Sequence, residues 1–472
     1  MAVYVYKQLK LVVKYIIRIS FFLRKRPYLV GKRKKTVAQF LMKMIIFIFS
    51  ILATCFGKEL EPFYCDFCQP EQLHISFGEK ANDIVVTWST FQSTNESRVQ
   101  YGERDNFSLE VYGRSKLFVD GGPLARSQYI HTVTLKDLKF GTKYVYHAGS
   151  VYGWSERFSF HTPPEGEDFP VRAAIFGDMG NADAHSLSFL QDEAERDNFD
   201  LILHVGDFAY DLDSEDAQVG DQFMRQIQPL AALVPYMTCP GNHEEMYNFS
   251  NYAARFSMPG RDASLFYSFD LGPVHFVSIS TEVYYYIEYG MDLISNQYDW
   301  LKQDLEEANL PETRLNRPWI VLFGHRPMYC TNNRRCDRVL TRIGINGQWA
   351  LERFLKDYGV DMVIWAHEHS YERTYPLYDG RIYKGSEEQP YVNPGAPVHI
   401  VTGSAGCREG KSEFGYNATE WSAFRNSDFG YSRFVAHNKT HIYMEQVSVE
   451  LAGQVVDSFW LVKDEHKPYD FL

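Results

Sequence analysis

A chain of 472 residues with 45% hydrophobic and 23% charged residues is long enough for two or three folded domains, and a mainly disordered protein is excluded. The first 58 residues carry 13 basic residues and no acidic one, so the remainder has 35 basic against 60 acidic residues, a net charge of −25. A body this acidic repels phosphate backbones, which excludes a nucleic-acid-binding protein.

Residues 1–57 are predicted to be an N-terminal extension followed by a secretory signal. Residues 11–23 are apolar but contain two basic residues, so they are too short and too charged to span a bilayer. The second run, Ile45–Phe56, follows a lysine and precedes a polar segment, which is the pattern of a cleaved signal. Met42 and Met44 stand where a shorter precursor would begin. The alternative to a cleaved signal is an uncleaved signal anchor. We expect a secreted, extracellular protein, or one in the endolysosomal lumen, with no stable membrane span after cleavage.

Sequons and cysteines agree with a secreted glycoprotein. Asn-x-Ser/Thr triplets occur at Asn95, Asn106, Asn248, Asn417 and Asn438. Without Cys55, six cysteines remain, an even number that suits an oxidising compartment, although the sequence does not fix their pairing. Cys330 and Cys336 would close a short loop and are favoured as a bridge. Cys65 and Cys68 could form a redox or zinc pair, but no second CxxC accompanies them, so a structural role is favoured.

Residues 69–164 are predicted to form an all-β, fibronectin-III-like sandwich. Runs with period-two alternation recur between turn residues, at Leu73–Phe77, Ile84–Trp88, Tyr129–Leu135, Tyr144–Ala148 and Arg157–Phe160. About seven such strands in roughly 100 residues, with an early core tryptophan, are typical of that sandwich. Leu138, Gly141 and Tyr144 have the spacing of its tyrosine corner.

Residues 170–472 are predicted to form an α/β layered domain of β-sheets flanked by helices. Apolar runs indicate strands at Val171–Phe176, Leu201–Val205, Val234–Thr238, His275–Ile279, Ile320–Phe323, Met362–Trp365 and His399–Val401. Helical stretches at Ala184–Glu195, Gln218–Ala232, Asn296–Ala308 and Gly347–Tyr358 separate them. Buried strands that alternate with helices indicate such a layered domain. Alternation from His441 to Val462 predicts a β-hairpin that closes one sheet.

Metal-capable side chains follow the ends of five predicted strands. The blocks are GDMG, GDFAY, GNHE, GHRP and AHEH, and they contain Asp178, Asp207, Tyr210, Asn242, His325, His367 and His369. Each block alone is weak, because Gly-Asp is usually a turn and a lone histidine usually packs or hydrogen-bonds. Strand ends of an α/β sheet share one edge, so the ordered set predicts that these seven residues form a metal site. The glycine before Asp or His is expected to supply φ freedom for the turn.

In this order the blocks resemble the five motifs of the purple acid phosphatases, which are metallophosphoesterases. The resemblance extends over nearly the whole chain from residue 69, and two later blocks, PVHIVTGSAGC and WSAFRNSDFGYSRF, resemble the animal long-form branch. It implies an acid phosphatase that hydrolyses small phosphate monoesters. The implied ligands are Asp178, Tyr210 and His369 for Fe(III), and Asn242, His325 and His367 for a divalent Zn, Fe or Mn ion, with Asp207 bridging the two.

Donor chemistry agrees with that assignment. Phenolate and carboxylate favour trivalent iron, whereas amide oxygen and neutral imidazole suit the divalent ions. A trivalent ion lowers the pKa of bound water strongly, so a metal-bound hydroxide is expected as the nucleophile even in mild acid. His243, beside Asn242, is expected to protonate the leaving alkoxide. The alternative is that His243 only orients Asn242 or the phosphate.

The motifs depart from the family pattern at three places. Leu322 replaces a valine and Ala366 a glycine, and both changes are mild. Many relatives carry a further substrate-binding histidine after the GHRP block; here Arg334 and Arg335 are either phosphate contacts or solvated side chains. Glu368 is expected to point away from the neighbouring ligands. The run Tyr284–Tyr286 could line the mouth of the site or pack in a sheet.

Two other functions stay open at this point. Diester-cleaving relatives share the core ligands, so a secreted phosphodiesterase is the nearest rival. A secreted binding protein that uses its β-domain would be favoured by loss of ligands, and none is lost. The sequence leaves open whether the chain forms a homodimer.

Overall fold

The structure, a computed structural model, describes residues 65–104, 107–260, 264–332, 340–415 and 419–469. The predicted extension and signal at residues 1–57 therefore lie outside the described residues. Of the helices within these ranges, none is long and apolar enough to cross a membrane.

The cysteines are only partly paired. Cys65 and Cys68 form a disulfide, which agrees with a structural role and leaves no thiolate there for zinc. Cys330 is disulfide-bonded, and Cys336, its predicted partner, lies outside the described residues. Cys239 and Cys407 are buried free thiols, so the even number of cysteines does not mean complete pairing.

The N-terminal part contains two antiparallel sheets that share one core, as predicted. One sheet has the order β1-β2-β6-β5, and the other the order β4-β3-β7-β8, with β9 paired to β7. The strands are β1 (Glu71–Phe77), β2 (Ile84–Thr90), β3 (Arg98–Gly102), β4 (Leu109–Tyr112), β5 (Arg114–Val119), β6 (Ser127–Leu135), β7 (Lys143–Ser150), β8 (Gly153–Trp154) and β9 (Phe158–His161). Trp88 lies in the shared core. The backbone N–H of Lys139 donates to the Tyr144 hydroxyl over 3.1 Å, which is the hydrogen bond expected of the tyrosine corner.

Two larger sheets follow. The six-stranded sheet has the order β14-β12-β10-β24-β25-β26 and the seven-stranded sheet the order β15-β16-β17-β18-β22-β19-β23. Their strands are β10 (Val171–Phe176), β12 (Leu201–Val205), β14 (Tyr236–Cys239), β15 (Tyr267–Leu271), β16 (Val274–Ser278), β17 (Trp319–Phe323), β18 (Met362–Trp365), β19 (Tyr371–Thr374), β22 (Val398–Thr402), β23 (Ser422–Asn426), β24 (Gly430–Asn438), β25 (His441–Ser448) and β26 (Gln454–Val462). Short pairs are β11 (Met179–Gly180) with β13 (Phe208–Ala209), and β20 (Leu377–Tyr378) with β21 (Arg381–Ile382). The predicted C-terminal hairpin is β25–β26, which joins β10 through β24.

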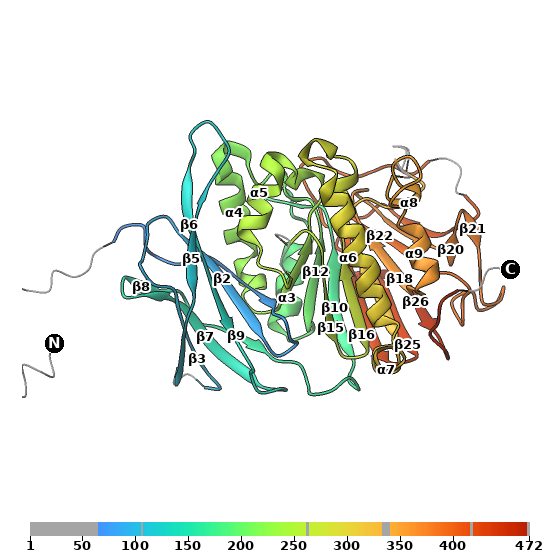
Figure 1. Ribbon diagram of the computed structural model, residues 1–472, viewed down its shortest axis with the longest axis horizontal. Coiled ribbons are helices and arrows are strands. Elements are labelled where there is room, and N and C mark those ends of the chain that lie inside the picture. Colours follow the sequence, from blue (N-terminus) through green and yellow to red (C-terminus); the bar gives the residue numbers. More distant parts are fainter. Residues whose placement is uncertain (1–64, 105–106, 261–263, 333–339, 416–418, 470–472) are drawn as a thin grey trace, which may run out of the picture. The chain divides into compact units, whose positions relative to one another are not determined.

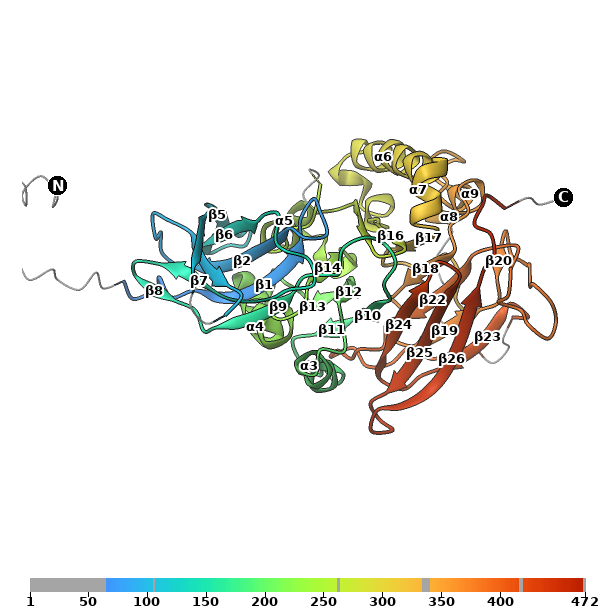
Figure 2. The same ribbon diagram turned by 90° about the horizontal axis from the view of Figure 1, so that it is seen from below.

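Helices connect and cover these strands. They are α3 (Leu187–Glu195), α4 (Ser214–Ala231), α5 (Met246–Arg255), α6 (Asp292–Ala308), α7 (Pro311–Asn316), α8 (Leu340–Ile343) and α9 (Glu352–Asp357), with 3₁₀ turns η1 (Asn242–Glu244), η2 (Glu282–Tyr284) and η3 (Ile287–Tyr289). Figure 1 shows α6 running beside β16 and β18, and Figure 2 shows α6 and α7 on one side of the seven-stranded sheet that contains these strands. The chain order of β-strands and helices is that of the predicted α/β layered domain.

Alternating side chains of β17 explain the layering. Trp319 and Phe323 belong to the core shared with the six-stranded sheet, whereas Leu322 packs in a second core with Leu301 and Leu305 of α6. Because successive side chains of a strand point to opposite faces, both faces of this strand are buried. The seven-stranded sheet therefore lies between the other sheet and a helical layer.

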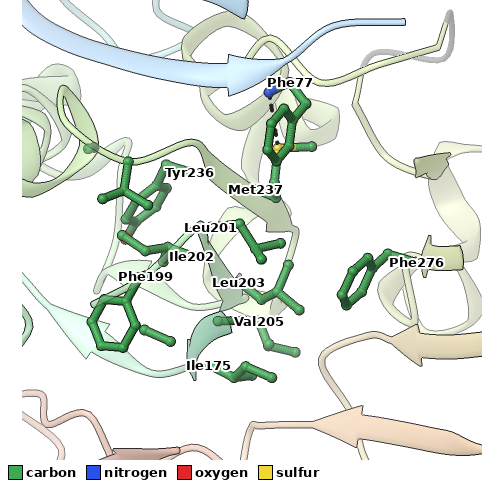
Figure 3. Close-up of a cluster of buried hydrophobic side chains, with 14 of the residues drawn as sticks. Phe77, Ile175, Phe199, Leu201, Ile202, Leu203, Val205, Tyr236, Met237 and Phe276 are labelled. Atoms are coloured by element: carbon green, nitrogen blue, oxygen red, sulfur yellow. Dashed lines mark hydrogen bonds between the residues drawn. The ribbon is translucent and has the colours of Figure 1, made fainter. Parts of the chain in front are cut away.

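The N-terminal sheets pack directly on the six-stranded sheet. The backbone N–H of Phe77 in β1 lies 3.4 Å from the Met237 sulfur in β14, and Figure 3 shows these two side chains beside the buried leucines of β12. A buried hydrogen bond links β1 to the helices, since Arg255 Nη1 of α5 donates to the Gln72 side chain over 3.2 Å and also lies 2.9 Å from Asp221 of α4. This packing holds β12 and β14, whose loops carry part of the site described next.

Candidate metal centre

Loops that follow five parallel strands carry the seven predicted metal-site residues and His243. Asp178 follows β10, Asp207 and Tyr210 follow β12, Asn242 and His243 lie in η1 after β14, His325 follows β17, and His367 and His369 follow β18. The prediction placed them at the edge of one sheet. In the structure β10, β12 and β14 belong to one sheet and β17 and β18 to the other, so the site forms where the carboxyl edges of two sheets meet.

Asp178, Tyr210 and His369 form the first donor cluster. The Tyr210 hydroxyl lies 3.1 Å from Asp178 Oδ1 and 2.9 Å from His369 Nε2. The distance from His369 Nε2 to Asp178 Oδ1 is 3.5 Å. All three side chains are buried. A phenol, a carboxylate and an imidazole therefore point at one small space.

Asp207, Asn242, His325 and His367 form the second cluster. One donor atom from each of Asp207, His325 and His367 lies within 4.8 Å of the other two. His325 Nε2 is 3.0 Å from Asp207 Oδ2 and 3.3 Å from Asn242 Oδ1. The second cluster thus has one carboxylate, one amide and two imidazoles, and it is richer in neutral donors than the first.

His243 lies between the two clusters. Its ring centroid is 4.3 Å from that of Tyr210, and its Nε2 is 3.9 Å from Asp207 Oδ2. Its Nδ1 hydrogen-bonds to Asp211 Oδ1. Burial alone would lower the pKa of His243, but the carboxylates of Asp207 and Asp211 outweigh it and raise the pKa to about 10.

Raised pKa values of His325 and His369 favour protons that balance the buried carboxylates. Burial lowers the pKa of His325, but the Asp207 carboxylate outweighs this effect and raises the pKa to about 9. Burial also lowers the pKa of His369, but the Asp178 carboxylate contributes to a net rise to about 11. Burial raises the pKa of Asp207, but His325 and His243 hold it below its ordinary value. Cations bound between these groups would replace the protons as the balancing charge, so the donor set fits metal ions.

Glycines bring the backbone close to the two aspartates. A Cβ at Gly241 would lie 2.2 Å from Asp207 Oδ1, and a Cβ at Gly403 would lie 2.3 Å from Asp178 Oδ2. Both carboxylates are therefore held in pockets that admit no side chain at these positions.

Of the glycines that precede the candidate Asp and His ligands, only one has the left-handed φ that was expected. Gly206 has φ +82°, as predicted, but the glycines before Asp178 and His325 are not in the left-handed region. The left-handed residues are instead candidate ligands themselves, with φ +59° at Asp178, +56° at Asp207 and +70° at His367. Such strained backbone is concentrated at functional sites, where the surrounding structure enforces it.

The remaining predicted residues fall into different places. Arg334 and Arg335 lie outside the described residues. Tyr284 is buried and donates to the Trp349 carbonyl, which is a packing role, whereas the Tyr286 hydroxyl lies 3.5 Å from the Asn242 carbonyl oxygen, next to the site. Glu368, between the two histidines of its block, is buried.

Sequence reasoning missed residues that hold or flank the donors. Glu244 accepts from the backbone N–H groups of Asp207, Phe208 and Gly241 and so ties two of the loops together. The Cys407 sulfur lies 3.6 Å from His369 Nδ1. Arg326 Nη1 lies 3.1 Å from His367 Nε2. Position in the blocks GNHE, GHRP and PVHIVTGSAGC could have indicated Glu244, Arg326 and Cys407.

Comparison with known proteins agrees with this architecture. Residues 171–371 match the calcineurin-like phosphoesterase family, which is the class defined by the fold and the donor clusters. Residues 70–162 match the purple acid phosphatase N-terminal domain, and residues 396–458 match the iron/zinc purple acid phosphatase-like protein C family.

Full-length relatives narrow the class further. The chain is 51% identical to acid phosphatase type 7 of Danio rerio over 411 residues, which covers 85% of this chain and 93% of that protein. It is 48% identical to acid phosphatase type 7 of Homo sapiens over 401 residues, which covers 84% of this chain and 91% of that protein. The chain belongs to the purple acid phosphatase family. A purple acid phosphatase structure from yellow lupin (Lupinus luteus) seeds aligns with a TM-score of 0.72 at 26% identity, covering 84% of this chain and 75% of that one.

Proposed function

We propose that this protein is an acid phosphatase that hydrolyses small phosphate monoesters at a dinuclear metal centre. The observation that carries the proposal is the presence of two adjacent donor clusters of different chemistry, with Asp207 close to His325 and His243. The relatives named as acid phosphatases support the reaction class.

The cluster chemistry supports a different metal in each site. We assign Fe(III) to Asp178, Tyr210 and His369, because phenolate and carboxylate are hard anionic donors. A divalent Zn, Fe or Mn ion suits Asn242, His325 and His367, with the Asp207 carboxylate shared between the two ions. When bound, the metal pair polarises the phosphoryl group and supplies an activated water nucleophile.

The chain's own residues orient the substrate and move the proton. Asp211 accepts a hydrogen bond from the His243 ring and keeps its second nitrogen directed toward the space between the clusters. His243 in that position holds a proton for the departing alkoxide oxygen. Glu244 fixes the loops of Asp207 and Asn242 against each other, so the donors need little rearrangement.

The visible spectrum tests this assignment. The purified, metal-replete protein is expected to hydrolyse 4-nitrophenyl phosphate at acid pH and to be purple, because a tyrosinate bound to Fe(III) gives a charge-transfer band. Tyr210→Phe should abolish the band with the fold intact. The control is Tyr284→Phe, because Tyr284 is equally buried but donates to the Trp349 carbonyl. An active but colourless wild-type protein would refute the iron–tyrosinate site, and an inactive metal-replete one would refute the phosphatase.

Secretion and N-glycosylation are also part of the proposal. Asn95, Asn248 and Asn438 have exposed side chains, which a glycan requires, whereas Asn106 and Asn417 lie outside the described residues. Expression in animal cells should place the protein in the medium or the endolysosomal lumen, with an apparent mass that falls after treatment with an N-glycosidase. Retention in the cytosol with an unchanged mass would contradict it.

A further inference from the structure

Arg326 occupies an unusual place beside the second donor cluster. It follows His325 directly, and its Nη1 lies 3.1 Å from His367 Nε2. Its side chain is 18% exposed, so the guanidinium is shielded but reaches solvent. A permanent positive charge next to a cation site needs a compensating anion or a role in binding one.

Two neighbours fix the guanidinium. Arg326 Nε lies 3.1 and 2.8 Å from the two carboxylate oxygens of Glu282, whose side chain is fully buried. The Tyr285 ring lies against the guanidinium, with its centroid 4.5 Å from the Arg326 Cζ. The group is thus pre-organised, because the cost of ordering a long side chain is already met in the folded protein.

Most of the donors of this guanidinium have no protein acceptor. A guanidinium has five N–H donors. Nε is used by Glu282 and one Nη1 hydrogen by His367, and within the described part of the chain no other acceptor lies within hydrogen-bonding distance. One hydrogen on Nη1 and two on Nη2 are therefore available to a ligand.

The contact with His367 cannot persist when His367 is a metal ligand. A neutral imidazole has one nitrogen lone pair. If Nε2 binds the metal, its lone pair is used; if Nδ1 binds it, Nε2 carries the hydrogen. In either case Nε2 no longer accepts from Arg326, and the whole Nη1–Nη2 edge is released toward the site.

We propose that Arg326 binds two terminal oxygens of the phosphoryl group through this edge and thereby selects monoesters over diesters. The inference rests on the proposed phosphatase function and on His367 as a ligand. A planar guanidinium edge matches two phosphate oxygens. A monoester has three terminal oxygens and a charge of up to −2, whereas a diester has two such oxygens and a charge of −1, so Arg326 gains less from the diester.

The test compares Arg326→Gln and Arg326→Lys with the matched control Arg433→Gln. Arg433 also pairs with a buried carboxylate, that of Glu193, but it lies on β24 away from the donors. For each metal-loaded protein we would measure the Kd of inorganic phosphate by calorimetry, kcat/KM for 4-nitrophenyl phosphate and for bis(4-nitrophenyl) phosphate, and the metal content.

Arg326→Gln is expected to weaken phosphate binding and to lower monoester kcat/KM by about tenfold to a hundredfold, as loss of a charged hydrogen-bond donor predicts. Diester turnover should change less than about threefold, Arg326→Lys should recover part of the loss, and Arg433→Gln should match wild type. Unchanged phosphate affinity, an equal fall for both esters, or loss of metal would overturn the proposal. A wild-type protein without phosphatase activity would instead refute the proposed function, and phosphate binding would still report on Arg326.

Discussion

Asp207→Asn is expected to lower kcat/KM for a phosphate monoester by about a thousandfold or more and to reduce the bound metal. The metal pair supplies several kcal/mol of transition-state stabilisation, and each 1.36 kcal/mol is about tenfold in rate. Asp207 is the carboxylate closest to His325, with 3.0 Å between Oδ2 and Nε2, and its side chain is almost fully buried. Loss of its charge removes the anion that offsets the repulsion between two cations.

The substitution preserves the local fold. Asp207 Oδ1 accepts from the His243 backbone N–H over 3.0 Å, and the amide oxygen of asparagine can keep that bond. The effect is therefore expected in activity and in metal stoichiometry, in a protein that keeps its fold.

A control comes from the other end of the same strand. Asp200 stands just before β12 and pairs with Arg172, with 2.6 Å between the charged atoms, far from the donors along the strand. Asp200→Asn should keep wild-type activity and metal content. Full activity and two metal ions per chain in Asp207→Asn would contradict the shared-carboxylate assignment.

The buried strands were the part of the fold that the sequence predicted best. β10 and β12 have the predicted bounds, because continuous apolar runs are buried on both faces. β4 and β5 escaped prediction because they are mostly exposed, with Leu109 and Leu117 turned to solvent, so burial imposed little pattern on their sequence. The hydrophobic pattern of a segment predicts its structure only where its side chains are buried in the core.

Helix ends depended on backbone geometry that composition does not encode. α9 is shorter than predicted because Gly347 and Trp349 have left-handed φ values, which stop a helix from starting there. α4 contains left-handed residues at Glu215–Ala217, so its regular part begins close to the predicted Gln218. α5 was not predicted. Its first turn contains left-handed residues at Tyr247, Asn248 and Phe249, so its regular part is too short to give a clear helical periodicity in the sequence.

The donors could be predicted, but their surroundings could not. Each candidate donor follows a strand, so motif order and strand ends were sufficient to predict that these residues lie close together. Glu282 contacts Arg326 across 44 residues of chain, and Cys407 contacts His369 across 38 residues. Both contacts depend on which strands are neighbours in the seven-stranded sheet, because Glu282 and Arg326 follow β16 and β17, and His369 and Cys407 follow β18 and β22. From the sequence, Arg334 and Arg335 were either phosphate contacts or solvated side chains, and that stays a prediction because both lie outside the described residues. Arg326 follows the candidate ligand His325 directly and was not singled out.

His243→Ala is expected to lower kcat by about a hundredfold or more while KM changes little, because a general acid acts in the transition state. The geometry supports the role: the ring lies against Tyr210, Nδ1 is held by Asp211, and Nε2 faces Asp207 Oδ2 at 3.9 Å and Glu409 Oε1 at 3.7 Å. The carboxylates of Asp207 and Asp211 favour the protonated imidazole, which is the form that donates.

The leaving group separates an acid from a residue that only positions the phosphate. 4-Nitrophenolate is a stable anion and needs little protonation, whereas an alkoxide needs a full proton. His243→Ala should therefore cost at least about tenfold more with an alkyl phosphate than with 4-nitrophenyl phosphate, in the range of a general-acid effect. His161→Ala, an exposed histidine of β9, should leave both rates unchanged. An equal loss with both esters would assign His243 to orienting Asn242 or the phosphate, because orientation matters equally for either leaving group.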